Sequence, residues 1–193
     1  MKHLFFLIAI FAVLPAGAKK IQLGLNVGGN YYHSADPAFA LRVMTDSGMI
    51  QWGAGIETGF RSSEFSVQHY NWQGQEVTYK DKAKQFYVAP NISANFRQFM
   101  KRGYTYLGAT IGYAFVNVTD YYGDNKQGAY SYYKEIRKEY NVKDGVFAGA
   151  QFGFVRDITH TIGINGEAGF RFAGLRGNTF NYVLLMAGIR YRI

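Results

Sequence analysis

The feature that most constrains the fold of this chain is a strict alternation of apolar and non-apolar residues that recurs along most of its length. Ile21, Leu23, Leu25 and Val27 share one face of an extended segment, and the residues between them are glutamine, asparagine and glycine. Alternation with a period of two is typical of β-strands whose two faces meet different surroundings. The pattern therefore predicts an all-β fold.

Six further segments repeat this alternation clearly, and one weaker segment resembles them. In the weaker segment, Phe65 to Trp72, the apolar residues change phase halfway. Counting it, we predict eight strands and hence an eight-stranded antiparallel up-and-down transmembrane β-barrel, because closing the sheet leaves no unpaired edges. The clear segments after residue 27 span residues 50–60, 86–96, 107–115, 146–154, 162–172 and 183–193.

The composition of the non-apolar faces indicates which side of the barrel meets solvent. These faces consist mainly of glycine, asparagine, glutamine, serine and tyrosine, with few charges. A soluble barrel would need many charged residues on its exterior, whereas a packed lumen needs only a few. We therefore expect the apolar face to meet lipid and the polar face to fill the lumen. The charges on the polar faces are chiefly Glu57, Glu167, Arg171, Arg190 and Arg192.

The intervals between the predicted strands alternate between long and short. Outer-membrane barrels have short periplasmic turns and longer external loops, so this alternation supports a membrane barrel with both mature termini in the periplasm. The long intervals are His33 to Gly48, Gln73 to Lys82, Asn117 to Lys143 and Ala173 to Phe180, and the short ones are centred on Ser62 and Ser63, Gln98 to Arg102, and Asp157 to Thr159.

The first residues of the chain have the order of a secretory signal peptide. Lys2 and His3 precede an apolar run from Leu4 to Leu14, and small residues follow up to Ala18. The run is too short for a membrane-spanning helix. We expect residues 1–18 to be a signal peptide and residues 19–193 to be the barrel domain. The chain contains no cysteine, so disulfides cannot stabilise it in an oxidising compartment.

The segment 19–193 resembles the small outer-membrane β-barrel proteins of Gram-negative bacteria. The most specific part is the C-terminal strand from Tyr182 to Ile193, which is similar to the signal that the barrel-assembly machinery recognises. The family usually ends in an aromatic residue, and Ile193 departs from that pattern. The resemblance implies location in the cell outer membrane among lipid and lipopolysaccharide. It also implies contact with the assembly machinery through the last strand.

Four charged residues on the polar faces are expected to form a network in the lumen. A buried carboxylate is costly without a cation, so Glu57 and Glu167 should face Arg171 and Arg190, with Arg61 or Arg192 as further partners. An alternative is that the network forms a gate or a proton path. We favour a structural plug, because eight strands enclose a space that side chains can fill.

The third long interval contains candidate binding residues for a partner outside the cell. Tyrosines offer rigid contact area, and basic side chains attract anionic groups. This loop could bind lipopolysaccharide phosphates, a glycan or a protein, and the alternative is a solvated loop without a ligand. The candidates are Tyr130, Tyr132, Tyr133, Lys134, Arg137 and Lys138.

Some barrels of this size acylate or deacylate lipid A with a histidine and serine or acidic partners. His33, Ser34 and Asp36 are neighbours, but in the enzymes the partners come from separate loops. We therefore predict no enzyme, cofactor, metal or nucleic-acid partner, and the net charge of +8 indicates surface electrostatics. A structural or surface-interaction role is favoured. Narrow-pore transport of small or apolar solutes comes second, and a lipid A-modifying acyl enzyme third.

Overall fold

The computed structural model describes residues 20–31, 35–46, 48–70, 76–123, 144–175, 178–179 and 181–193. The expected signal peptide, residues 1–18, lies outside this part of the chain. No helix in the described residues is long and apolar enough to cross a membrane. The strands are β1 (Ile21–Tyr31), β2 (Ala35–Thr45), β3 (Ile50–Tyr70), β4 (Glu76–Met100), β5 (Gly103–Gly123), β6 (Gly145–Asp157), β7 (Ile162–Leu175), β8 (Asn178–Thr179) and β9 (Tyr182–Arg192).

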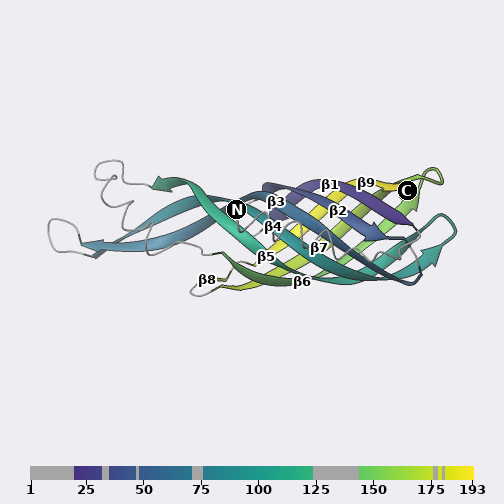
Figure 1. The fold of residues 1–193 in the computed structure, drawn as a ribbon. Helices are drawn as coiled ribbons and strands as arrows, with labels where there is room; N and C mark the ends of the chain where they lie inside the picture. Colours follow the sequence, from purple (N-terminus) through teal and green to yellow (C-terminus); the bar gives the residue numbers. More distant parts are fainter. Residues whose placement is uncertain are drawn as a thin grey trace.

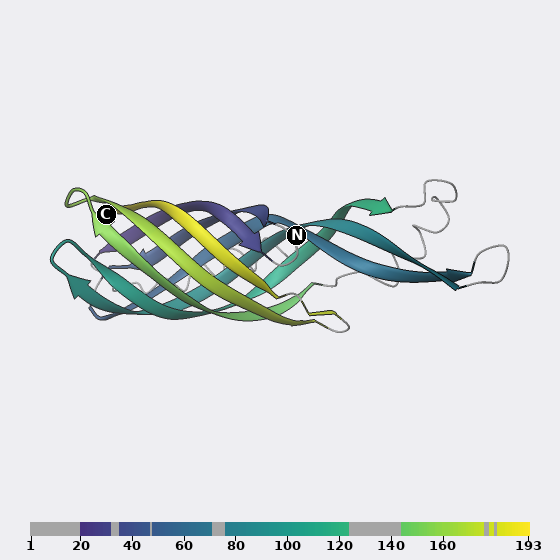
Figure 2. The ribbon, with the colours of Figure 1, turned by 180° about the vertical axis from the view of Figure 1, so that it is seen from behind.

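Eight of these strands close into a barrel, as predicted. Neighbouring strands pair in the order β6-β5-β4-β3-β2-β1-β9-β7, and the pairing of β6 with β7 completes the ring (Figure 1). All pairings are antiparallel. The two-residue β8 pairs only with the end of β7 and is not part of the wall. Figure 2 shows yellow β9 between purple β1 and green β7, where the first and last strands of the chain meet.

The two ends of the barrel differ in shape. Ile21 and Ile193 exchange two backbone hydrogen bonds, of 3.2 and 2.8 Å, so the first and last strands end side by side. Three connections between strands lie at this end, which we call the terminus end. The opposite end is called the loop end. The connections at the terminus end span residues 46–49, 101–102 and 158–161.

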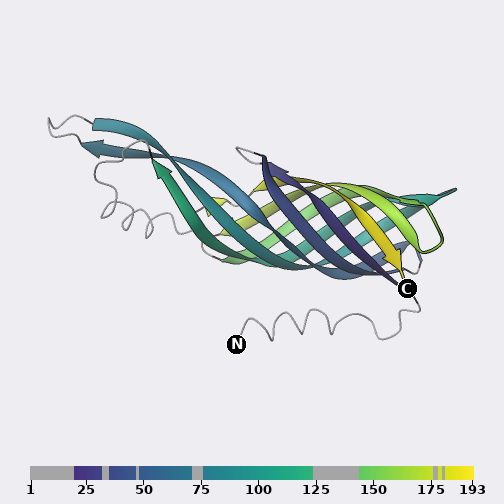
Figure 3. The same cartoon turned by 90° about the horizontal axis from the view of Figure 1, so that it is seen from above.

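Three strands continue beyond the barrel at the loop end. The pairing of β2 with β3 ends at Ala38 and Gly59, whereas β3 and β4 remain paired as far as Tyr70 and Glu76. The pairing of β4 with β5 also continues, to Gly123. Figures 1 and 3 show this three-stranded sheet projecting past the other strands, and we call it the loop-end extension.

The structure corrects the predicted long loop from His33 to Gly48, because this interval contains β2. Outward and inward residues alternate along β2, as in the other strands. However, the inward positions include Ala38, Ala40 and Met44, so both faces of β2 contain apolar residues. β2 also contains Pro37, and proline is uncommon in the interior of a strand. Both features hid the period-two pattern.

The structure also corrects the turn that was predicted at Ser62 and Ser63. β3 runs through this point, with Ser62 opposite Lys84 of β4. The weak segment after Phe65 is therefore not a separate strand, and residues 65–70 form the outer part of β3. The predicted turns at Gln98 to Arg102 and at Asp157 to Thr159 are confirmed.

Parts of three other predicted loop intervals belong to strands. β4 begins at Glu76, within the interval from Gln73, and β5 continues to Gly123, within the interval from Asn117. β7 likewise extends to Leu175. The loops at the loop end are therefore shorter than predicted, and the strands that carry them are longer.

The two faces of the wall match the predicted orientation. Leu107 of β5 has 64% of its surface exposed, and Ile111, Ile164 and Leu185 also point outward. The inward positions are almost completely buried and mostly polar. They include Gln22, Asn26, Gln51, Glu57, Tyr87, Asn91, Asn95, Phe147, Gln151, Asn165, Glu167, Arg171, Met186 and Arg190.

Candidate functional site: the charged cluster of the lumen

Four charged side chains meet near the middle of the lumen, and we call them the lumen cluster. They are Arg42 of β2, Glu57 of β3, and Glu167 and Arg171 of β7. All four side chains are buried. Their inward direction follows from the pleat, because alternate residues of a strand point to the same face.

Glu57 and Arg171 form the central contact of the cluster. Arg171 donates from Nη2 to Glu57 Oε1 over 2.6 Å and from Nε to Glu57 Oε2 over 3.1 Å. This fork geometry is the strong, bidentate form of an arginine–carboxylate pair. β3 and β7 are four strands apart in either direction around the ring. The ion pair therefore crosses the diameter of the barrel.

Arg42 joins the two carboxylates of the cluster. Its Nη2 lies 3.1 Å from Glu57 Oε1 and 2.7 Å from Glu167 Oε1, and its Nη1 also contacts Glu167 Oε2. Arg171 Nη2 lies 3.7 Å from Glu167 Oε1. Two guanidinium groups and two carboxylates thus neutralise one another inside the lumen, which offsets the cost of burying them.

Neutral groups complete the hydrogen bonding of the cluster. The Tyr106 hydroxyl donates to Glu167 Oε2 over 2.5 Å, and the Tyr182 hydroxyl donates to Glu57 Oε2 over 3.4 Å. Arg171 passes directly over Gly149 of β6. A Cβ at Gly149 would lie 2.7 Å from Arg171 Cδ, so glycine is needed for this close approach.

A chain of amide side chains continues from the cluster toward the terminus end. Arg171 donates to Gln151 over 3.2 Å, and Gln151 donates to Asn95 over 2.8 Å. Asn95 then donates to Gln51 over 3.5 Å, and Gln51 donates to Gln22 over 3.1 Å. These residues come from β7, β6, β4, β3 and β1. These hydrogen bonds cross-link five strands of the wall, and the side chains that form them occupy the lumen between the cluster and the terminus end.

A second group of ion pairs lies at the terminus end, and we call it the terminus cluster. Asp46 binds Arg97 over 2.7 Å and Arg192 over 3.1 Å, and Arg192 also binds Asp157 over 2.8 Å. The Arg97 guanidinium lies 4.9 Å from the centre of the Tyr104 ring. Charged and aromatic side chains from several strands therefore meet at the terminus end.

The structure brings together three of the four residues named for the lumen network: Glu57, Glu167 and Arg171. Arg190 is buried in the lumen but forms no ion pair with either glutamate. Sequence reasoning missed Arg42, because β2 was predicted as a loop. The outward residues Phe39 and Leu41 on either side of Ala40 were the signal that could have revealed it.

Most of the other candidate residues lie outside the described part of the chain. The loop residues Tyr130, Tyr132, Tyr133, Lys134, Arg137 and Lys138 lie outside the described residues, as do His33 and Ser34. Asp36 points inward and accepts hydrogen bonds from the backbone N–H and the hydroxyl of Ser62, over 2.7 and 3.2 Å. Asp36 thus binds β2 to β3 beyond the point where their regular pairing ends. Within the described ranges, no group of histidine, aspartate and glutamate side chains could hold a metal ion.

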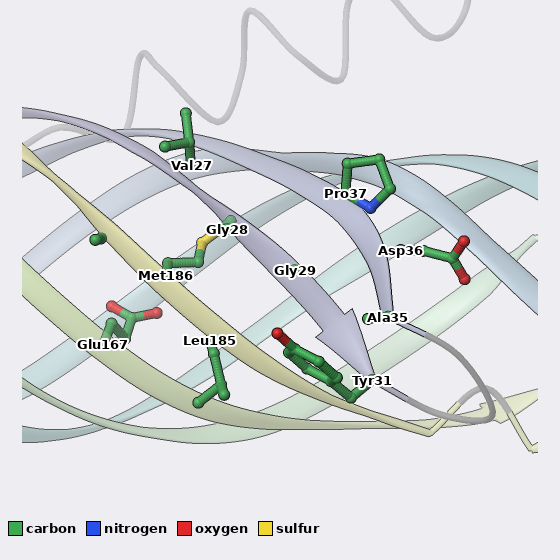
Figure 4. A pocket seen from close by; sticks show the side chains of 11 residues that line it. Val27, Gly28, Gly29, Tyr31, Ala35, Asp36, Pro37, Glu167, Leu185 and Met186 are labelled. Atoms are coloured by element: carbon green, nitrogen blue, oxygen red, sulfur yellow. The ribbon is translucent and has the colours of Figure 1, made fainter.

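A pocket of about 590 Å³ lies where β1, β2 and β9 meet (Figure 4). Gly28 and Gly29 contribute no side chains to the wall here. The backbone is continuous, with Gly28 opposite Met186 and Gly29 opposite Leu185. The pocket is lined from the outer face by Val27, Gly29, Tyr31, Ala35, Pro37, Leu185 and Ala187, and from the inner face by Gly28, Asp36, Glu167 and Met186.

Comparison with known proteins finds solved structures with a similar fold. No family model and no curated protein matches the sequence. The structure of Neisserial surface protein A is similar with a TM-score of 0.56 and 10% identity, covering 89% of this chain and 95% of that one. The outer membrane protein OprG from Pseudomonas aeruginosa matches with a TM-score of 0.49 and 12% identity, covering 90% and 95%. This chain therefore has the fold of the eight-stranded outer-membrane β-barrels of Gram-negative bacteria.

Proposed function

We propose that the protein is an integral outer-membrane barrel with a structural or surface-interaction role. In this proposal residues 19–193 form the barrel after removal of residues 1–18, and both mature termini lie in the periplasm. The closed barrel anchors the loop-end extension at the cell surface, where its loops bind a partner. The protein is not proposed to act as an enzyme.

The outer face of the wall supports insertion into a membrane. Most of the outward side chains on the strands of the ring are apolar, as Leu25, Phe39, Trp52 and Phe152 illustrate. A closed barrel also pairs its backbone groups between strands, which is a condition for crossing hydrocarbon. A face of this composition would be unfavourable in water, whereas it matches a lipid environment.

The observation that carries the proposal is the ion pair between Glu57 and Arg171 across the barrel diameter. A solute moving along the axis would have to separate this pair and the amide chain below it, and then pass the terminus cluster. Separating a buried ion pair is strongly unfavourable. The lumen therefore favours an anchor over an open pore, and the function is expected at the surface.

The composition of the third loop supports a binding role at that surface. Along the chain this loop connects the loop end of β5 to β6, and its candidates are Tyr130, Tyr132, Tyr133, Lys134, Arg137 and Lys138. A cluster of basic and tyrosine side chains favours anionic ligands with apolar parts. Lipopolysaccharide meets this description, and a glycan or an extracellular protein is the alternative.

Binding to lipopolysaccharide can be measured with the protein in phosphatidylcholine nanodiscs. The probes are lipopolysaccharide and lipopolysaccharide stripped of its phosphates. The variant K134A/R137A/K138A removes three loop cations, and the matched control K101A/R102A/R156A removes three exposed cations that lie toward the terminus end. Since each cation near an anionic surface contributes about 1 kcal/mol, the loop variant should bind the phosphorylated probe at least tenfold more weakly. Equal binding by wild type and both variants would contradict the binding site.

The pocket between β1, β2 and β9 favours a second function, passage of small apolar solutes sideways through the wall. It has lining residues on both faces of the wall at Gly28 and Gly29. A disulfide between cysteines at Gly29 and Leu185, which are opposite in register, would hold β1 and β9 together. If this passage operates, liposomes with the reduced variant take up a small apolar solute and the oxidised variant blocks uptake. No uptake in the reduced state would exclude the second function.

A further inference from the structure

A group of buried donor atoms on the inward faces of β1 and β9 has no hydrogen-bond partner among the described residues. The atoms are Gln22 Nε2, Asn26 Nδ2, and Nε and Nη1 of Arg190. Arg190 is 2% exposed, and Gln22 and Asn26 are fully buried. A buried donor without an acceptor has lost its hydrogen bonds to water without replacement. An acceptor that is not part of the described chain would satisfy these four donors.

The register of β1 and β9 brings these side chains together. Arg190 lies opposite Gly24, and Gln22 and Asn26 lie two residues to either side of Gly24 on the same inward face. A Cβ at Gly24 would lie 2.6 Å from Arg190 Nη1. The guanidinium group thus lies against the bare backbone of Gly24, whose inward neighbours along β1 are Gln22 and Asn26.

The orientation of both amides is set by other hydrogen bonds. Gln22 Oε1 accepts hydrogen bonds from Gln51 and Tyr104, over 3.1 and 2.7 Å. Asn26 Oδ1 accepts a hydrogen bond from Asn165 Nδ2 over 2.9 Å. Their oxygens are therefore used, and the amide nitrogens remain as donors. Asn165 Oδ1 is an acceptor in the same region that has no partner among the described residues.

The charge of Arg190 distinguishes this region from the rest of the lumen. The lumen cluster contains two arginines and two glutamates, and the terminus cluster pairs Arg97 and Arg192 with Asp46 and Asp157. Arg190 forms no ion pair with any acidic residue in the described part of the chain. A buried cation is costly unless an opposite charge accompanies it.

We propose that Arg190, Gln22 and Asn26 bind one small monovalent inorganic anion of the chloride type. The anion would neutralise Arg190 and accept hydrogen bonds from the two amide nitrogens. A water molecule could accept some of these hydrogen bonds, but the charge of Arg190 would stay uncompensated. The inference is independent of the loop-binding role, because it concerns only the lumen.

Bromide can replace chloride and is visible by anomalous diffraction. Crystals of the wild-type protein grown in sodium bromide should show an anomalous peak within hydrogen-bond distance of Arg190 Nη1 and Gln22 Nε2. The peak should persist in Arg156→Gln, which removes an exposed arginine, and disappear in Arg190→Gln. Ordered water at this position in the wild type, without an anomalous peak, would overturn the proposal.

Stability in different salts provides a second measurement that needs no crystal. Unfolding by urea is compared in chloride and in gluconate at equal ionic strength. A ligand that binds only the folded barrel lowers the equilibrium constant for unfolding about tenfold when it is present at about ten times its Kd. Wild type and Arg156→Gln should show this difference between the salts, and Arg190→Gln should not. Equal unfolding constants in both salts for wild type would also overturn the proposal.

Discussion

Glu57 of β3 and Arg171 of β7 lie on opposite sides of the eight-stranded ring and are joined by hydrogen bonds of 2.6 and 3.1 Å. Contacts between neighbouring strands follow from the backbone register, whereas this one requires two side chains to meet at the barrel axis. It ties opposite walls together and occupies the space through which a solute would pass. We therefore expect the stability of the barrel and the proposed closure of its lumen to depend on the same pair.

Substitution of Arg171 by methionine should destabilise the barrel strongly. Glu57 would keep only Arg42 as a cation, and Gln151 would lose a donor. Removing one partner of a buried ion pair costs about 3 to 5 kcal/mol. Urea unfolding in lipid vesicles measures this loss, and Arg156→Met, at an exposed position, should change stability by less than about 0.5 kcal/mol.

A double substitution separates the contribution of the ion pair to stability from the contribution of side-chain packing. In Glu57→Gln/Arg171→Met no uncompensated charge remains at the diameter, because Arg42 still binds Glu167. Replacing both members of a buried pair is often close to neutral. The double variant should therefore be more stable than Arg171→Met alone. Additive losses would show that the two residues are not coupled.

Arginine at outward positions should reveal which face meets lipid. Leu107, Ile111, Ile164 and Leu185 are exposed apolar residues of the wall. Arginine near the middle of the bilayer costs about 2 to 4 kcal/mol in such barrels, and less near the interface. Folding titrations in lipid vesicles should show this cost at the wall positions and a smaller one for Ile158→Arg, in a turn at the terminus end. A near-zero cost at all four wall positions would refute the assigned face.

The orientation in the membrane can be tested by cysteine labelling, because the chain has no cysteine of its own. A single cysteine at Gly128, in the connection between β5 and β6, should react with a membrane-impermeant maleimide on intact cells. A cysteine at His160, in the turn between β6 and β7, should react only after the outer membrane is broken. Reversed labelling would place the loop end in the periplasm.

The sequence allowed the barrel to be predicted because most strands have one apolar and one polar face. The alternation in β1, β6 and β9 reflects an exposed apolar outer face and a polar lumen, and the direction of both faces was predicted correctly. The pattern failed in β2, where Ala38 and Ala40 face the lumen. It also failed to show that β3 continues past Ser62 as part of the extension.

The candidate site was only partly predictable. A polar residue in a strand can be assigned to the lumen, but its partner depends on the strand across the ring. Arg42 was missed together with its strand, and its place between Glu57 and Glu167 follows from the closed geometry. Arg190 satisfied the same sequence pattern as Arg171, yet it lies against Gly24 and forms no ion pair with either carboxylate.

The permeability of the purified protein tests the central claim of a closed lumen most directly. Eight-stranded barrels enclose a space that side chains can fill, whereas water-filled porins use about 16 to 18 strands. Liposomes that contain the folded wild-type protein, compared with liposomes containing a general porin, are placed in an isosmotic disaccharide solution. We predict no swelling with this protein and rapid swelling with the porin. Swelling at a rate similar to that of the porin would contradict the closed lumen and the proposed role as an anchor.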